Sequence, residues 1–279
     1  MSQAYSISSK TSSNDNAYSR FLWNVAASYV EVCHYATIND FVFNNFRQHT
    51  KYTKILEHVT YEQGWQYIEQ IKMINRIDLL QDKQKIQQND SVGNPKTYEY
   101  NEFGTFSPTT LRYVKVASEL KHIFSTLHDQ QLSICEIGVG YGGQCRILQE
   151  YFDIKNYTLI DITPAINLAK RYLENFSLKC KVDFITLNEI DCIKSDLCIS
   201  NYAFSELNRG LQDVYYEKVI QHASHGYMTY NHISPKHFNT YTVYEFSEIV
   251  KHNAKISDEM PNSCPENRIL VWGNADVAA

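Results

Sequence analysis

Four glycines fall within the six residues that follow the predicted strand Leu132–Ile137, namely Gly138, Gly140, Gly142 and Gly143. Glycine has no Cβ atom, so the main chain can turn tightly there and a ligand can approach the backbone. The helix predicted to begin at Gly142 also has unpaired N–H groups in its first turn. A plain turn from a strand to a helix needs only one or two glycines, so residues 138–143, the glycine bend, are predicted to bind a ligand. Because the spacing matches GxGxxG, a dinucleotide is one alternative ligand.

Short apolar runs alternate with helical stretches in the second half of the chain. The residues predicted as strands are 132–137, 157–162, 182–187, 196–200, 226–231 and 268–272. The residues predicted as helices between them are 142–152, 164–176, 211–222 and 242–252. Strands that alternate with helices pair in parallel, so the pattern predicts an α/β sheet.

The residues before the first predicted strand have a different pattern. Residues 1–16 are rich in Ser, Asn and Asp and are predicted to form a disordered tail. Apolar residues recur at three- and four-residue steps in 18–88 and 109–127, which predicts helices. Between them, Gly and Pro interrupt the pattern, so 89–107 is predicted to be a loop. The aromatic residues of this loop are Tyr98, Tyr100, Phe103 and Phe106. Their rings are expected either to form a lid over a ligand or to belong to the core. The predicted division is a tail (1–16), a helical N-terminal region (17–107, with the lid-like loop 89–107) and an α/β domain (108–279).

Composition and charge argue against several classes of protein. The chain has 279 residues, with 26 Lys and Arg against 31 Asp and Glu, and a net charge of −5. No basic surface for nucleic acid is therefore expected. The sequence has no run of 18 apolar residues and no apolar leader, so we expect neither a membrane span nor a secretory signal. Seven cysteines without a CxxC pair favour a reduced, cytoplasmic protein. Four histidines fit no zinc-ligand spacing, so no metal is expected: His222, His225, His232 and His237.

Two carboxylates lie on either side of the glycine bend. Glu136 is two residues before Gly138, where a negative charge would repel a pyrophosphate but not the cationic amino-acid end of S-adenosylmethionine. Asp161 ends the next predicted strand, 18 residues after Gly143, where a carboxylate can accept both ribose hydroxyls of either ligand. Asp161 could instead cap the helix that begins near Pro164.

Several blocks resemble class I S-adenosylmethionine-dependent methyltransferases, and more narrowly the sugar O-methyltransferase family. These blocks are Phe106–Tyr113, Glu136–Gln144, Tyr157–Asp161, Ser200–Leu207, Gly226–Asn231 and Trp272–Gly273. The resemblance runs from about residue 93 to 273 and leaves 1–88 unmatched. It implies a Rossmann-like methyltransferase fold, with a seven-stranded, mostly parallel sheet, helices on both faces, and a cofactor-binding catalytic domain over 108–279. Cofactor and acceptor would meet at the carboxyl ends of the strands.

The resemblance also implies roles for individual residues. For the cofactor, the resemblance implies Glu136, Gly138, Gly140 and Gly142 at the methionine part, Asp161 at the ribose, Asn188 at the adenine, and Asn201 and Tyr202 at the transferred methyl group. Tyr141 and Ile162 are also expected to bind the cofactor. Those implied for the acceptor are Phe106, Arg112, Tyr113 and His237.

Methyl transfer to a sugar hydroxyl is helped by a general base, which can be His, Glu or Asp. Glu206 and His232 each follow a predicted strand and are the catalytic candidates, with His237 as a third choice. Glu206 could instead cap a helix, and His232 could be an ordinary loop residue. Arg112 could hold the carboxylate of the cofactor or of an acidic sugar, or lie on the surface.

The expected partner is a sugar or glycoconjugate acceptor, with no nucleic acid and no membrane. The N-terminal helices could also form a homodimer interface. Three other functions stay open at this point: a methyltransferase for a non-sugar molecule, an NAD-dependent oxidoreductase, and a binding protein without turnover.

Overall fold

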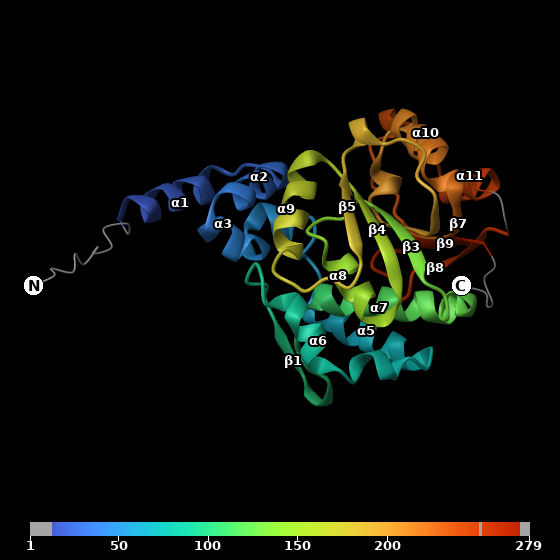
Figure 1. Ribbon diagram of the computed structural model, residues 1–279, viewed down its shortest axis with the longest axis horizontal. Coiled ribbons are helices and arrows are strands. Elements are labelled where there is room, and N and C mark those ends of the chain that lie inside the picture. The colour runs from blue at the N-terminus through green and yellow to red at the C-terminus, as the bar shows by residue number, and fades with distance from the viewer. Residues whose placement is uncertain (1–12, 251–252, 274–279) are drawn as a thin grey trace, which may run out of the picture.

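The predicted sheet is present in the computed structural model, which describes residues 13–250 and 253–273 (Figure 1). Its strands are β3 (Leu132–Ile137), β4 (Ile154–Ile160), β5 (Lys181–Ile185), β6 (Ser195–Asn201), β7 (Ala223–Tyr230), β8 (Lys255–Asp258) and β9 (Arg268–Trp272). They lie in the order β5-β4-β3-β6-β7-β9-β8. Strands β3 to β7 are parallel, and β9 runs antiparallel to both β7 and β8.

The chain changes direction across the sheet at β3. From β3 it moves outward to β4 and β5, and it then returns to β6 on the other side of β3. Open α/β sheets bind ligands outside the carboxyl ends of the strands at such a switch point. The glycine bend follows β3 and Asn201 ends β6, so the fold brings two predicted parts of the site together there.

Two hydrophobic cores cover the two faces of the sheet. On β6, Leu197 and Ile199 belong to one core and Cys198 to the other, as the two-residue period of a strand requires. The first core includes residues of α7 (Pro108–Ile123), α8 (Gly143–Tyr151) and α9 (Thr163–Leu173), and the second includes residues of α10 (Arg209–Lys218) and α11 (Val243–Ile249). The parallel strands are therefore covered on both sides, as the sequence predicts.

The boundaries of the strands differ in how well they follow from the sequence. Strands β3 and β9 begin and end at the predicted residues, whereas β4 to β7 begin one to three residues earlier than predicted. The sequence does not predict β8, because its four residues Lys-Ile-Ser-Asp contain a single apolar side chain at the edge of the sheet.

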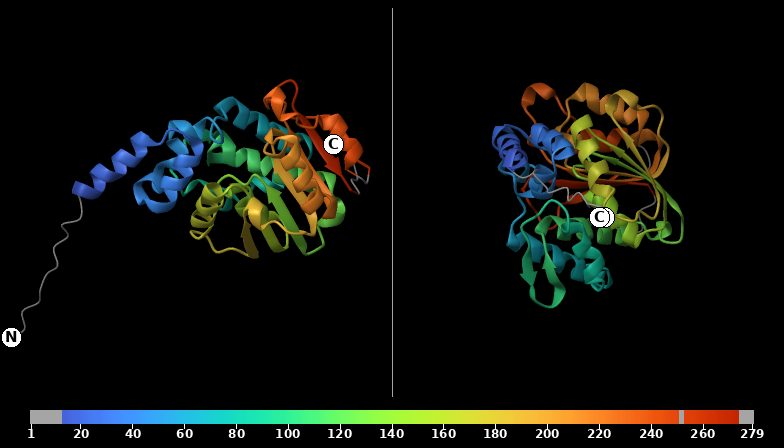
Figure 2. Two further views of the ribbon diagram at one scale, coloured as in Figure 1. Left: turned by 90° about the horizontal axis from the view of Figure 1, so that it is seen from above. Right: turned by 60° about the vertical axis from the view of Figure 1, so that its left-hand side comes forward.

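The helical N-terminal region packs directly on the α/β domain. Its helices are α1 (Ser13–Val25), α2 (Tyr29–Ile38), α3 (Asp40–Asn45), α4 (Thr50–Thr53), α5 (Tyr61–Met73) and α6 (Lys83–Gln87). Helix α2 contacts α9 and α5 contacts α7, while α1 lies at one end of the molecule and contacts α2 and α3 (Figures 1 and 2). The predicted tail needs a correction, because α1 begins at Ser13 and residues 13–16 are helical; residues 1–12 lie outside the described part. In residues 13–250 and 253–273, no helix is both long and apolar enough to cross a bilayer.

The predicted lid-like loop is a small hairpin. Strands β1 (Tyr98–Tyr100) and β2 (Gly104–Phe106) pair antiparallel within it. Tyr100 and Phe106 are fully buried, and Phe103 lies 6.1 Å from the ring of Trp65 on α5. Tyr100 and Phe106 therefore belong to the core, whereas Tyr98 and Phe103 are only partly buried against it. The assignment of Phe106 to the acceptor is wrong, because its side chain has no exposed surface.

Candidate active site

The glycine bend has backbone angles that favour glycine. Gly138, Gly140 and Gly142 have φ values of +79°, +56° and +83°, where a side chain strains the backbone. A Cβ atom on Gly138 would lie 1.9 Å from the Cβ of Ala203, and one on Gly140 would lie 2.7 Å from Cδ1 of Leu56. The bend is therefore pressed closely between the end of β6 and the loop that follows α4.

Asp161 holds the bend from the neighbouring strand. Its Oδ2 accepts hydrogen bonds from the N–H groups of Val139 (2.8 Å) and Gly140 (3.2 Å), and its Oδ1 accepts one from Ile162 (2.7 Å). Burial raises the pKa of Asp161 to about 6, although these three N–H groups lower it. The alternative of a helix cap is wrong, because Ile162 precedes α9 as its cap residue and no side chain caps that helix. A carboxylate has about four acceptor positions, so one is left for a ligand hydroxyl.

Glu136 does not present a charge to the bend. Its side chain is buried, and Oε2 accepts a hydrogen bond of 2.6 Å from the hydroxyl of Tyr157. Burial raises its pKa from 4.5 to about 8; the Tyr157 hydrogen bond lowers it, and the charge of Asp161 raises it. Burial therefore favours the protonated, neutral form of this carboxyl. The prediction that its charge selects a cationic ligand over a pyrophosphate is therefore not supported by the structure.

A Glu136→Gln variant tests this protonation through the pH dependence of stability. The folded pKa lies above the ordinary value, so the folded state binds the proton more tightly, and the wild-type free energy of unfolding falls as pH rises from about 4.5 to about 8. Glutamine keeps an oxygen that accepts from Tyr157 but cannot ionise. We expect the stability of the variant relative to the wild type to increase between pH 5 and pH 8, measured by urea unfolding. An equal difference at both pH values would contradict this protonation.

Tyrosines of the N-terminal region gather over the bend. Tyr29 and Tyr52 lie 5.2 Å apart, and Tyr141 in the bend lies 6.0 Å from Tyr113 on α7. The hydroxyls of Tyr52 and Tyr141 are buried and have no hydrogen-bond partner among the described residues. Two buried, unpaired hydroxyls beside a glycine cradle fit a polar ligand such as S-adenosylmethionine. Neither Tyr29 nor Tyr52 was predicted as a site residue, because their part of the sequence matches no motif.

The carboxyl end of β6 supplies the other side of the site. Tyr202 has a φ of +69°, which is rare for a residue other than glycine and is typical of strained functional positions. Its N–H donates to the carbonyl oxygen of Thr229 at 2.8 Å, and its hydroxyl donates to the carboxylate of Glu259. Oδ1 of Asn201 accepts a hydrogen bond from Oγ1 of Thr229 at 3.0 Å. Glu259, from the loop between β8 and β9, was not predicted.

Arg112 is a buried cation close to this end of the sheet. Its guanidinium lies 5.6 Å from the ring of Tyr202 and donates from Nη2 to the carbonyl oxygen of Leu56 at 3.4 Å. Within residues 13–250 and 253–273 it forms no ion pair, unlike the buried Arg47. The prediction of a surface arginine is therefore wrong, and the side chain is available to bind a carboxylate.

The predicted bases lie at the ends of β6 and β7. Oε1 of Glu206 accepts a hydrogen bond of 2.7 Å from Nδ2 of Asn231, and desolvation of the carboxyl raises its pKa despite this bond. His232 follows Asn231 and is exposed, as is His237 in a loop further along. Asn188, predicted at the adenine, is exposed in the turn after β5. No group of three or more His, Cys, Asp or Glu side chains in the described part is placed to hold a metal ion.

The structure also contains a cavity of about 730 Å³ in the N-terminal region, which we call the N-terminal cavity. Its lining residues are Arg47, Gln48, Thr53, Glu57, His58, Val59, Thr60, Tyr61, Glu62, Lys96, Tyr98 and Pro108. Only Pro108 belongs to a block that carries the resemblance, and Tyr98 belongs to the loop predicted to form either a lid or part of the core.

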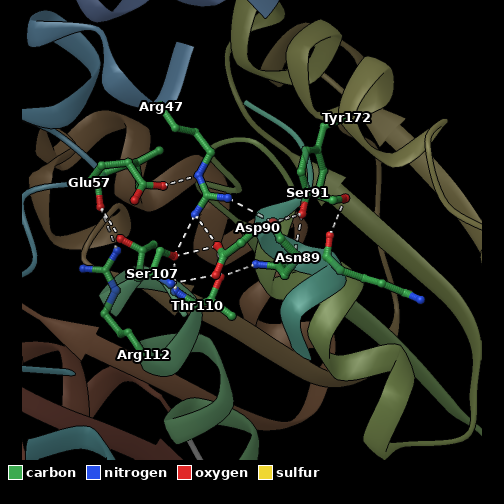
Figure 3. Close-up of polar contacts among 12 residues, drawn as sticks. Arg47, Glu57, Asn89, Asp90, Ser91, Ser107, Thr110, Arg112 and Tyr172 are labelled. Carbon is green, nitrogen blue, oxygen red and sulfur yellow. Dashed lines mark hydrogen bonds and ion pairs between the residues drawn. The ribbon is translucent and has the colours of Figure 1, made fainter. Parts of the chain in front are cut away.

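A buried network around Arg47 joins this cavity to the α/β domain (Figure 3). Nε of Arg47 donates a hydrogen bond to Oε1 of Glu57 at 2.6 Å, and Nη2 of Arg47 lies 3.1 Å from Oδ1 of Asp90. Asp90 in turn accepts from the N–H and the hydroxyl of Ser107, which caps α7, both at 2.7 Å. Burial opposes the charge of Arg47, but Glu57, Tyr141 and Asp90 raise its pKa above the usual range. The network fixes the loop after α4 against the start of α7.

No protein-family model and no curated protein matches this chain. Solved structures with a similar fold include the N-methyltransferase NodS from Bradyrhizobium japonicum in complex with S-adenosylhomocysteine (14% identity, 58% of this chain and 85% of that chain, TM-score 0.44). Another is phosphoethanolamine N-methyltransferase 2 from Haemonchus contortus in complex with S-adenosylmethionine (14% identity, 51% of this chain and 39% of that chain, TM-score 0.39). A third is the pyocyanin biosynthetic protein PhzM (12% identity, 60% of this chain and 58% of that chain, TM-score 0.43).

Proposed function

We propose that this chain is an S-adenosylmethionine-dependent O-methyltransferase that transfers a methyl group to a sugar hydroxyl. The observation that carries the proposal is the glycine bend, held by Asp161 and lying opposite Tyr202 at the switch point of a seven-stranded sheet. An NAD-binding Rossmann domain has a sixth parallel strand in its second half. Here the antiparallel strand β9 occupies that place, which favours the methyltransferase. The sugar acceptor is proposed from the resemblance of Phe106–Tyr113 and Ser200–Leu207 alone.

In this proposal each part of the site has one task. The bound cofactor supplies a sulfonium-linked methyl group whose leaving group becomes neutral. Asp161 accepts a hydroxyl of the ribose, the glycine bend lies along the methionine part, and Arg112 binds the carboxylate of that part. Tyr202 and Asn201 border the methyl group and keep the acceptor oxygen in line with it. Glu206, oriented by Asn231, receives the proton of the hydroxyl, with His232 as the alternative base.

A transfer assay tests this function. The full chain is incubated with methyl-labelled S-adenosylmethionine and a panel of free hexoses, methyl glycosides and nucleotide sugars. We expect label in at least one sugar product and a loss of about 100-fold in kcat for Glu206→Gln, in the range of general-base catalysis. Transfer to a non-sugar molecule, with none to any sugar, would refute the sugar acceptor and leave the methyl transfer standing.

A further inference from the structure

We infer that Glu259 gives the site its preference for a positively charged cofactor, and that it acts through the hydroxyl of Tyr202. The inference rests on the proposed methyl transfer and assigns a role to a residue outside every block that carries the resemblance. Glu136, the carboxyl group predicted to select a cation, is buried against Tyr157, so this task falls to another group. The basis of the inference is the hydrogen bonding of Glu259 and the position of Tyr202 beside the glycine bend.

Glu259 is a buried carboxylate in the loop between β8 and β9, with 2% of its surface exposed. Its Oε2 accepts hydrogen bonds from the N–H of Ser263 at 3.1 Å, the hydroxyl of Ser263 at 2.6 Å and Nδ2 of Asn267 at 2.9 Å. Its Oε1 accepts a hydrogen bond from the hydroxyl of Tyr202. Burial alone would raise the pKa of Glu259, but these hydrogen bonds outweigh burial and lower the pKa below its ordinary value. The charged form of the carboxyl group is therefore the favoured one.

Tyr202 brings the effect of this charge to the surface of the site. Among the described residues, Glu259 forms no ion pair, so no neighbouring cation cancels its charge. Because the hydroxyl of Tyr202 donates to Glu259, its oxygen has only lone pairs left for a ligand, and the carboxylate polarises that oxygen. Tyr202 is partly exposed whereas Glu259 is buried, so a ligand can contact the tyrosine but not the carboxylate.

Tyr202 lies beside the glycine bend together with Arg112. At one end of the bend, a Cβ atom on Gly138 would lie 1.9 Å from the Cβ of Ala203, the residue after Tyr202. The other end lies against Leu56, whose carbonyl oxygen accepts a hydrogen bond from Nη2 of Arg112 at 3.4 Å. The guanidinium of Arg112 lies 5.6 Å from the ring of Tyr202. These contacts run from one end of the bend to the other, so a ligand on the bend lies next to Arg112 and Tyr202.

The two charges beside Tyr202 match different parts of S-adenosylmethionine. Arg112 is proposed to bind the carboxylate of the methionine part, which compensates the charge of the guanidinium. Glu259 is then the charge that remains to attract the sulfonium group. S-adenosylhomocysteine has the same carboxylate and ammonium groups but a neutral sulfur atom, so it lacks only this attraction. Glu259 therefore favours the cofactor over the demethylated product, which helps the product to leave after transfer.

Calorimetric titration with S-adenosylmethionine and with S-adenosylhomocysteine tests the inference. Each ligand is titrated, without an acceptor, into the full chain as wild type, as Glu259→Gln and as Tyr202→Phe. For Glu259→Gln we expect the Kd of S-adenosylmethionine to rise about tenfold and the Kd of S-adenosylhomocysteine to change less than about twofold. Tyr202→Phe keeps the ring but removes the polarised oxygen, so we expect a smaller loss in the same direction. The readout is the ratio of the two dissociation constants, because a general disturbance of the site would weaken both ligands alike.

Tyr227→Phe is the matched control for Tyr202→Phe. The hydroxyl of Tyr227 also donates to a buried carboxylate, that of Glu119, but Tyr227 lies in the middle of β7 and is fully buried. We expect this variant to keep the wild-type ratio of dissociation constants. Melting temperatures show whether each variant is folded, and Tyr202→Phe decides the question if Glu259→Gln does not fold.

Two results would overturn the inference. One is an unchanged ratio in the folded Glu259→Gln and Tyr202→Phe variants, and the other is an equal loss of affinity for both ligands. In either case, binding of S-adenosylhomocysteine by the wild type leaves the proposed function standing. If the wild type binds neither ligand, the proposed function fails, and the inference fails with it.

Discussion

We expect Gly138→Ala to lower the affinity for S-adenosylhomocysteine about 100-fold, a loss of about 2.7 kcal/mol. The new Cβ atom would lie 1.9 Å from the Cβ of Ala203, an atom with no rotamer of its own that could move aside. The end of β6 must therefore shift away from the bend, and Tyr202 shifts with it. Overpacking of this kind also costs about 1–3 kcal/mol of stability. Calorimetric titration and thermal melting measure the two effects.

Substitutions at two other glycines are compared with Gly138→Ala. Gly140→Ala meets the flexible side chain of Leu56 instead of a fixed atom, so we expect weaker binding with a smaller loss of stability. Gly210→Ala is the control, because its Cβ would meet nothing closer than 3.6 Å on α10. Equal affinities for Gly138→Ala and Gly210→Ala would show that the bend does not bind this ligand.

The second large effect concerns stability. Arg47→Met removes the cation between Glu57 and Asp90 and leaves two buried carboxylates without their partner. Breaking a buried ion pair by removing one partner typically costs about 3–5 kcal/mol. For a chain of this size we expect a melting temperature lower by about 6–20 °C.

Lys72→Met is the matched control for Arg47→Met. Lys72 forms an ion pair with Glu69 at 2.6 Å, but both side chains are well exposed. Exposed pairs contribute under about 1 kcal/mol, so its melting temperature should stay close to the wild-type value. A similar loss in both variants would contradict the importance of burial in the network around Arg47.

The sequence predicts most strands of the sheet because the pattern that marks each of them lies within the strand and its neighbouring residues. Strand β3 (Leu-Ser-Ile-Cys-Glu-Ile) is mostly apolar and ends at glycines, and β9 has four consecutive apolar residues after Arg268. Both strands therefore have the predicted boundaries. Strand β8 has one apolar residue, and its position depends on pairing with β9, which no local pattern encodes.

The parts of the site that the sequence missed depend on long-range contacts. Leu56 lies against Gly140, and the loop that carries it is held on α7 by hydrogen bonds from Thr109 and Arg112 to its carbonyl oxygen. At Glu136 the sequence predicts a carboxyl group next to the glycine bend, but it does not predict whether that group is charged. Its protonation depends on burial and on Tyr157, 21 residues further along the chain.

The central claim is that the glycine bend binds S-adenosylmethionine, and calorimetric titration of the wild type tests it most directly. S-adenosylhomocysteine and NAD are titrated separately into the full chain. We expect a saturable heat with one site for S-adenosylhomocysteine and none for NAD. Saturable binding of NAD, with no heat from S-adenosylhomocysteine, would contradict the account.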